Sequence, residues 1–259
     1  MKTVAIGTLK GGTGKTTLVF NIAGVLAEKY KVLVVDFDPQ CNLSSNAGVD
    51  ITDQDRKSTR DIFENPRIDP ADLVVSLPLG FDIIPSHIKL TATELQLVGR
   101  SAREHIVQYY IEDNQKFFDG YDYILFDTNP SMGIVNQNAF LAADSIVLVS
   151  DVSDNGVQGV ELFMYLWEEC RTNLRMPDNV KALIVNNYDQ RMNLSSELIE
   201  YCQDNDDLSP LLVLNPIPAR VKLKETAVEH KPINELAADT DACVAIRGVV
   251  DELFKKEVF

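Results

Sequence analysis

The stretch that decides the fold is TLKGGTGKTTLVFN at residues 8–21, which follows the apolar run TVAIGTL at residues 3–9. An apolar run, a glycine-rich loop and a second apolar pattern in this order predict a strand, a loop and a helix. The stretch matches the phosphate-loop pattern G-x-x-x-x-G-K-[ST] apart from its first glycine. A glycine-rich turn with two surface lysines is the alternative, and the flanking strand and helix argue against it.

Each residue type in this loop suits phosphate binding. Glycines adopt positive φ without a steric penalty, so backbone N–H groups turn inward toward phosphate oxygens, and the helix N-terminus adds a partial positive charge. Lys15 is expected to neutralise the β- and γ-phosphates of ATP, and the Thr16 hydroxyl to ligate Mg²⁺. The residues expected at the nucleotide are Gly11, Gly12, Thr13, Gly14, Lys15, Thr16 and Thr17.

The overall composition excludes several classes of protein. The chain has 259 residues, of which 45% are hydrophobic, and we predict a single domain over residues 1–259. No run of 18 apolar residues and no apolar leader is evident, so we expect a cytoplasmic protein. A net charge of −15 disfavours general attraction to nucleic acid or anionic lipid. Four cysteines without a C-x-x-C pair argue against zinc, a cysteine-ligated cluster or a disulfide framework, and we expect buried thiols at Cys41, Cys170, Cys202 and Cys243.

Short β-rich runs alternate with longer helical patterns along the chain. This alternation predicts an α/β fold, in which a mostly parallel twisted sheet carries helices on both faces. The polar, proline-punctuated residues 44–72 are expected to form a mobile excursion with one short helix around Ser58–Phe63. The expected strands are TVAIGTL, KVLVVDF (31–37), GFDIIPS (80–86), YDYILFD (121–127), DSIVLVS (144–150), VKALIVNN (180–187) and LLVLNP (211–216).

Two further helices have predicted starting points. One is expected to begin at Thr91, where Glu94 completes a capping box. A second is expected to begin at Ser101, with Glu104 in the same role, and to continue to Phe118.

Carboxylates follow two of the predicted strands. The run VLVVDFDPQ carries Asp36 and Asp38, whose spacing puts both side chains on one side of an extended chain. The run YDYILFDTNPS carries Asp127 at the position of a Walker B aspartate. An aspartate at a strand end is also a common turn former. Because Mg²⁺ takes oxygen ligands, the phosphate loop favours a magnesium site here.

Together these features resemble the ParA/MinD group of deviant Walker A ATPases, and more closely the small Soj-like ParA partition ATPases. The resemblance covers nearly the whole chain. It is carried by KGGTGKTTLVFNIAGVLAEKYKVLVVDFDPQCNLS (10–44), YDYILFDTNPS (121–131), NAFLAADSIVLV (138–149), LIVNNYDQR (183–191) and IPARVKLKE (217–225). It implies a P-loop NTPase fold and Mg²⁺-dependent hydrolysis of ATP to ADP and phosphate.

The resemblance also implies roles for single residues. Lys10 is similar to the signature lysine that reaches across an ATP-sandwiched dimer to the partner's phosphates. Asp38 would orient the attacking water, while Asp36 and Asp127 would hold Mg²⁺ through water. Asn186 would contact the edge of adenine, although an amide at a strand end is also a common cap.

Partition ATPases of this type bind non-specific DNA as ATP dimers, and this binding uses basic residues near the C-terminus. Arg220, Lys222 and Lys224 form such an island in this acidic chain, with a solvated amphipathic face as the alternative. The resemblance thus implies a homodimer with ATP, nucleoid association, a ParB-like centromere-binding or adaptor protein as partner, and no membrane. No N-terminal helix-turn-helix extension is expected.

The sequence departs from the family pattern at three places. Asn129 stands in the segment after Asp127, where D-[TC]-P-P-S is usual, and bears on the switch geometry. Ala219 stands where an arginine commonly follows the proline, and bears on DNA binding. VSDVSD at residues 149–154 replaces a proline-bearing segment.

Three other functions are open. A MinD-like membrane-positioning ATPase calls for an added amphipathic C-terminal helix. We interpret the C-terminal stretch as the ordinary last helix of the fold, DACVAIRGVVDELFKKEVF. An iron–sulfur scaffold is disfavoured because C-x-x-C is missing. In a metabolic ATP-dependent ligase or kinase of the same fold, Lys10 would be incidental.

Overall fold

Within residues 1–153 and 156–259, which the computed structural model describes, seven strands form one sheet in the order β3-β4-β2-β5-β1-β6-β7. Neighbouring strands are parallel, except that β3 and β4 pair antiparallel at one edge. The strands are β1 (Lys2–Gly7), β2 (Val32–Asp36), β3 (Val75–Ser76), β4 (Asp82–Ile84), β5 (Tyr123–Asp127), β6 (Ser145–Asp151) and β7 (Val180–Asn186). The predicted mostly parallel sheet is confirmed.

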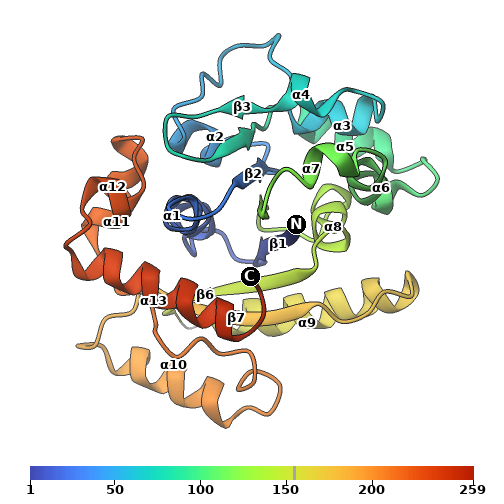
Figure 1. The fold of residues 1–259 in the computed structure, drawn as a ribbon. Coiled ribbons are helices and arrows are strands. Elements are labelled where there is room, and N and C mark those ends of the chain that lie inside the picture. Colours follow the sequence, from blue (N-terminus) through green and yellow to red (C-terminus); the bar gives the residue numbers. More distant parts are fainter. Residues whose placement is uncertain (154–155) are drawn as a thin grey trace.

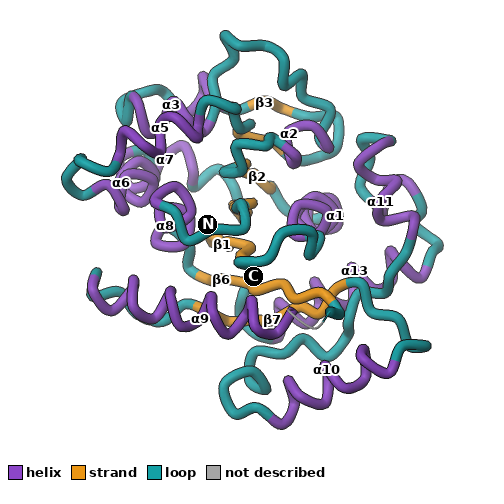
Figure 2. The backbone as a smooth tube through the Cα atoms, turned by 180° about the vertical axis from the view of Figure 1, so that it is seen from behind, coloured by secondary structure: helices purple, strands orange, loops and turns teal. Residues whose placement is uncertain are grey.

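Helices cover both faces of this sheet, as predicted (Figures 1 and 2). On one face α1 lies against the sheet and contacts α2, α11, α12 and α13, while α3, α5, α6, α8 and α9 cover the other. The helices are α1 (Lys15–Ala27), α2 (Asn42–Asn46), α3 (Thr59–Glu64), α4 (Pro70–Leu73), α5 (Leu90–Leu97), the 3₁₀ helix η1 (Arg103–His105), α6 (Ile106–Asp113), α7 (Gln115–Phe118), α8 (Ile134–Leu141), α9 (Gly156–Asn173), α10 (Asn193–Asp204), α11 (Val221–Val228), α12 (Ile233–Leu236) and α13 (Asp241–Lys255).

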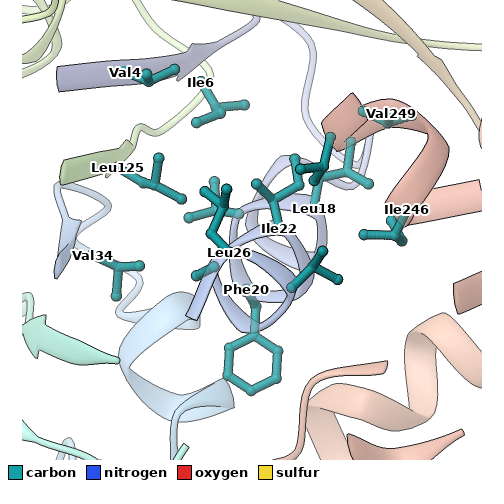
Figure 3. Close-up of a cluster of buried hydrophobic side chains, with 14 of the residues drawn as sticks. Val4, Ile6, Leu18, Phe20, Ile22, Leu26, Val34, Leu125, Ile246 and Val249 are labelled. Atoms are coloured by element: carbon teal, nitrogen blue, oxygen red, sulfur yellow. The ribbon is translucent and has the colours of Figure 1, made fainter. Parts of the chain in front are cut away.

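Alternate side chains of each central strand point to opposite faces, which produces two hydrophobic cores. In β1, Val4 and Ile6 face the α1 side and Ala5 faces the other. Because both faces are buried, the central strands are continuous apolar runs instead of alternating ones. The core around α1 is shown in Figure 3 and includes Val4, Ile6, Leu18, Phe20, Ile22, Leu26, Val34, Leu125, Ile246 and Val249.

The predicted capping box at Thr91 is wrong. Thr91 lies inside α5, which begins one residue earlier, after Lys89. Glu94 serves a different helix: its carboxylate accepts the N–H of Val135 at the start of α8 (3.1 Å). A long-range contact has replaced the local one.

The predicted helix from Ser101 to Phe118 is also wrong in its start and its continuity. Ser101 lies in a turn, and α6 begins only after η1. The first turn of α6 is capped by Asn138 of α8, whose side-chain oxygen accepts the N–H of Val107 (3.1 Å). Asn114 separates α6 from α7, and its side chain bonds back to the carbonyl of Tyr110 (2.9 Å).

Residues 44–72 are packed more extensively than expected. The predicted helix near Ser58 is present as α3, with a capping box between Ser58 and Asp61, and α2 and α4 accompany it. The side chains of Phe63 and Leu73 are buried in the core of the second face. The parts of the segment that carry α2, α3 and α4 therefore pack onto the protein, whereas residues 50–55 between α2 and α3 are exposed.

The run LLVLNP is not a strand of the sheet, contrary to prediction. Only an isolated bridge links Leu212 to Leu183 of β7. Between this bridge and the next backbone bond, from the N–H of Ile217 to the carbonyl of Val185 (2.8 Å), the N–H groups of Leu214 and Asn215 donate to the carboxylate of Glu252 in α13 (2.6 and 2.9 Å). The short antiparallel edge strand β3 was not anticipated from the sequence.

The four cysteines are free thiols. Cys41, Cys202 and Cys243 are buried and Cys170 is partly exposed. Burial raises the pKa of Cys41, Cys170 and Cys202 to about 11, so these thiols stay protonated near neutral pH.

Candidate nucleotide-binding site

The glycine-rich loop joins β1 to α1 at the carboxyl edge of the sheet and forms one wall of a cleft of about 590 Å³. Gly12 and Gly14 have φ of +81° and +87°, a region that side chains with a Cβ rarely adopt. Thr13, within the loop, is only 1% exposed and does not line the cleft. The predicted loop residues that line the cleft are Gly11, Gly12, Gly14, Lys15, Thr16 and Thr17.

Lys15 is the first residue of α1 and lies among carboxylates. Its side chain is buried, and burial lowers its pKa, while the charges of Asp127 and Asp38 act in the opposite direction. An ammonium group that is partly withdrawn from water attracts an anion more strongly than an exposed one does. Lys15 is therefore suited to bind a phosphate that enters the cleft.

Asp36 and Asp127 end the neighbouring strands β2 and β5 and are paired in register. Both are fully buried, and burial raises the pKa of each carboxyl above its ordinary value. The Asp36 carboxylate accepts the N–H of Asp38 (3.0 Å) and the N–H and hydroxyl of Ser44 (2.9 and 2.7 Å). The Ser44 hydroxyl in turn accepts the N–H of Ser86 (3.0 Å). Asp36 thus orders the segment that follows β2.

Asp127 differs, because neither of its buried carboxylate oxygens has a hydrogen-bond partner among the described residues. Buried acceptors without partners are costly, so this carboxylate suits a cation or the water bound to one. In the described part of the chain, no three His, Cys, Asp or Glu side chains converge closely enough to hold a metal ion. Mg²⁺ keeps several waters and binds nucleotide phosphates. Asp127 and the Thr16 hydroxyl therefore fit Mg²⁺ that arrives with a nucleotide.

Asp38 follows β2 and lines the same cleft, with 7% of its surface exposed. Its carboxylate accepts the N–H of Gln40 (2.9 Å), and its own N–H is bound by Asp36. This turn holds the carboxylate at the cleft wall, opposite the loop.

Asn186 ends β7 and supports the loop from below. Its side-chain nitrogen donates to the carbonyl of Thr13 (2.7 Å), and a Cβ placed on Gly14 would overlap that nitrogen. Asn186 also lines the cleft, so its expected contact with adenine stays a prediction. The support of the loop is a role that sequence reasoning missed.

Lys10 begins the loop, and its ammonium is bound by residues at the end of β6. It donates to both carboxylate oxygens of Asp151 (2.9 and 3.2 Å) and to the hydroxyl of Ser153. Both partners belong to the segment 149–154 in which the sequence departs from the family pattern, of which Asp154 lies outside the described residues.

The basic residues of the C-terminal island lie at the start of α11 and are exposed. Arg220 and Lys224 line the cleft. Arg220 forms an ion pair with Asp241 (2.6 Å), and Lys222 forms one with Glu225 (2.6 Å). Part of the island's charge is therefore balanced locally.

The other two departures from the family pattern, Asn129 and Ala219, are held in place by hydrogen bonds. The side-chain nitrogen of Asn136 in α8 donates to the carbonyl and side-chain oxygen of Asn129 and to the carbonyl of Ser131, each at 2.8 Å. The N–H of Ala219 donates to the carbonyl of Tyr188 (2.9 Å). The cleft wall contains further residues that no motif indicated, among them Asn187, Leu223 and Ala227.

A family model and several known proteins are similar in sequence to this chain. A family model described as an AAA domain matches residues 1–182. The sporulation initiation inhibitor protein Soj of Bacillus subtilis is 30% identical over 241 residues, which cover 90% of each chain. The chromosome partitioning protein ParA of Caulobacter vibrioides is 29% identical over 239 residues, covering 90% of this chain and 86% of that protein.

Solved structures share the fold. Cobyrinic acid a,c-diamide synthase of Mycobacterium smegmatis, determined with a bound ATP analogue and magnesium, superposes with a TM-score of 0.83. The match covers 98% of this chain and 95% of that one, at 23% identity. Likeness at this level of identity extends to the fold alone.

Proposed function

This chain belongs to the ParA/Soj family of P-loop ATPases, and we propose that it is a Mg²⁺-dependent ATPase that acts in DNA partition. The observation that carries the ATPase proposal is the cleft that Lys15, Asp38 and the glycine-rich loop line, together with the unpartnered carboxylate of Asp127, which is buried near enough to Lys15 for their charges to interact. The partition role draws support from relatives such as the chromosome partitioning protein ParA.

In the proposed mechanism, each subunit holds ATP through its own loop. Backbone N–H groups and Lys15 would bind the phosphates, the Thr16 hydroxyl would ligate Mg²⁺, and Asp36 and Asp127 would hold the ion through water. The ion, when bound, supplies positive charge against the phosphate oxygens. Asp38 orients the attacking water, because its carboxylate is held at the cleft wall by the N–H of Gln40, while its own N–H donates to Asp36.

The second nucleotide contact comes from the partner subunit. Lys10 lies at the start of the loop and is bound at the end of β6, with 28% of its side chain exposed. In the proposed ATP-bound homodimer the Lys10 ammonium leaves its contacts at the end of β6 and places its charge against the partner's phosphates. An arginine finger acts in trans in the same way.

We place the DNA-binding surface of this dimer on the basic island, which binds DNA without sequence specificity. The ion pairs that Arg220 and Lys222 make are exposed, and such pairs contribute only about 0–1 kcal/mol, so DNA phosphates exchange readily for the carboxylates. Two islands per dimer provide more phosphate contacts than one, within a chain whose net charge of −15 repels DNA elsewhere. A ParB-like or adaptor protein would stimulate hydrolysis and release the dimer from the nucleoid.

A metabolic ATP-dependent enzyme is the second candidate, because the cobyrinic acid synthase shares the fold. A MinD-like role has less support. The apolar side of α13 is buried, with Ile246, Val249 and Leu253 at most 1% exposed, and is not free to meet lipid. Among the helices that the structure describes, none combines the length and apolar character of a membrane span. Sedimentation with ATP and either plasmid DNA or liposomes separates these candidates.

The decisive experiment on the partition proposal is Lys10→Ala. Light scattering with a non-hydrolysable ATP analogue should find a dimer for the parent and a monomer for the variant, while fluorescent-nucleotide binding to the monomer is largely kept. Lys116→Ala on α7 is the matched control, because it removes an exposed lysine outside the cleft. A variant that dimerises and hydrolyses ATP as the parent does would show that Lys10 is incidental, as in a metabolic enzyme.

A further inference from the structure

The ammonium of Lys10 has a well-defined receptor within its own subunit. Asp151 accepts from it with both carboxylate oxygens (2.9 and 3.2 Å), and the Ser153 hydroxyl is a third partner. The Ser153 hydroxyl also donates to the carboxylate of Asp151 (3.1 Å). The ion pair is partly shielded from water, with 28% of the Lys10 side chain and 19% of the Asp151 side chain exposed.

This receptor is built on the sheet and its continuation. Asp151 is the last residue of β6 and is paired in register with Asn186 of β7, the residue that supports the loop. The N–H of Ser153 donates to the carbonyl of Asp151 (3.0 Å). Gly156 begins α9 against the same carbonyl, so closely that an added Cβ would overlap it. These contacts fix the backbone of Asp151, and the Ser153 hydroxyl orients its carboxylate toward Lys10.

We propose that Asp151 is a positioning residue that holds Lys10 in its own subunit until an ATP-bound partner takes it. The inference rests on the proposed function, in which Lys10 serves the partner's nucleotide. In the inferred sequence of events the Lys10 ammonium leaves Asp151 for the partner's phosphates, so the ion pair breaks when the dimer forms. Asp151 thus sets a threshold that ATP and the partner subunit must overcome together.

The effect on the dimer dissociation constant follows from the strength of the Lys10–Asp151 ion pair and from the number of such pairs that break per dimer. An exposed or partly shielded ion pair contributes up to about 1 kcal/mol, which corresponds to about fivefold in an equilibrium constant. Two lysines are released per dimer, so the dissociation constant of the ATP-bound dimer should fall by up to about 25-fold when the pair is removed.

The test is Asp151→Asn, which removes the charge and keeps the shape and the backbone hydrogen bonds. Sedimentation equilibrium with a non-hydrolysable ATP analogue should find a tighter dimer than in the parent. In the nucleotide-free protein, amine acylation of Lys10, followed by mass spectrometry, should become faster. Asp113→Asn, an exposed aspartate on α6, is the charge-matched control and should change neither.

The outcomes are distinguishable. A dimer that is equally tight or weaker in Asp151→Asn overturns the inference, since Asp151 would then assist the active position of Lys10. If Asp151→Asn does not fold, Ser153→Ala gives the same test with a smaller expected change. If the parent stays monomeric with ATP, the proposed function fails, and the acylation rate still decides whether Asp151 holds Lys10.

Discussion

The contact between Asn186 and the loop makes a quantitative prediction about Gly14→Ala. A side chain in the left-handed region costs about 1–2 kcal/mol, and Gly14 has φ of +87°. The new Cβ would also displace the amide of Asn186, so the hydrogen bond to the Thr13 carbonyl, worth about 1 kcal/mol, is lost as well. We expect Gly14→Ala to lower the free energy of unfolding by about 2–3 kcal/mol.

A double-mutant cycle isolates the contact from the backbone cost. Asn186→Ala alone should cost about 1 kcal/mol, because it removes the same hydrogen bond. In that background Gly14→Ala meets no amide and should cost only the backbone term of about 1–2 kcal/mol. The coupling is therefore about 1 kcal/mol, measurable by urea unfolding of the nucleotide-free protein. Additive effects, within about 0.3 kcal/mol, would refute the view that Asn186 supports the loop through Gly14.

Three further predictions concern the proposed chemistry and the basic island. Lys15→Ala should weaken nucleotide binding by about 100-fold, since a charged hydrogen bond contributes up to about 3 kcal/mol; an unchanged affinity in a fluorescence titration would remove Lys15 from the site. Asp38→Ala should bind ATP and accumulate as a dimer with little turnover, so parental phosphate release in that variant would contradict its role. Replacing Arg220, Lys222 and Lys224 together should flatten the salt dependence of DNA binding by about 0.9 in log–log slope per lost phosphate contact; a parental slope would place the DNA contacts elsewhere.

The sequence predicts those parts of the fold that local chemistry decides. The runs that became β1, β2, β5, β6 and β7 are mostly apolar at consecutive positions because both faces of the sheet are covered. Local signals failed where a distant group took over a backbone hydrogen bond. Glu94 and Asn138 cap helices to which they do not belong, and Glu252 binds the N–H groups of Leu214 and Asn215 within the run that was expected to be a strand.

The same limit applies to the candidate site. The motif indicates which residue types surround a phosphate, and the structure brings six of the seven loop residues to one cleft, with Thr13 beneath it. It does not indicate what holds Lys10, because Asp151 is 141 residues away along the chain. Nor does spacing separate Asp36 from Asp127: their strand-end positions are equivalent, and the bonds from Asp38 and Ser44 make one occupied and leave the other open.

Ser44 donates hydrogen bonds to Asp36 and accepts one from Ser86, and these bonds also affect the rates of amide hydrogen exchange. The amide hydrogens of Ser44 and Ser86 are both held by this connection, although the two residues are 42 apart in the sequence. Amides that share one set of bonds become open to exchange with deuterium in a single opening event. The loop that follows β4 should therefore exchange in step with α2. A ligand that stiffens one should slow the other, and the amide of Ser86 becomes a reporter of cleft occupancy from outside the cleft.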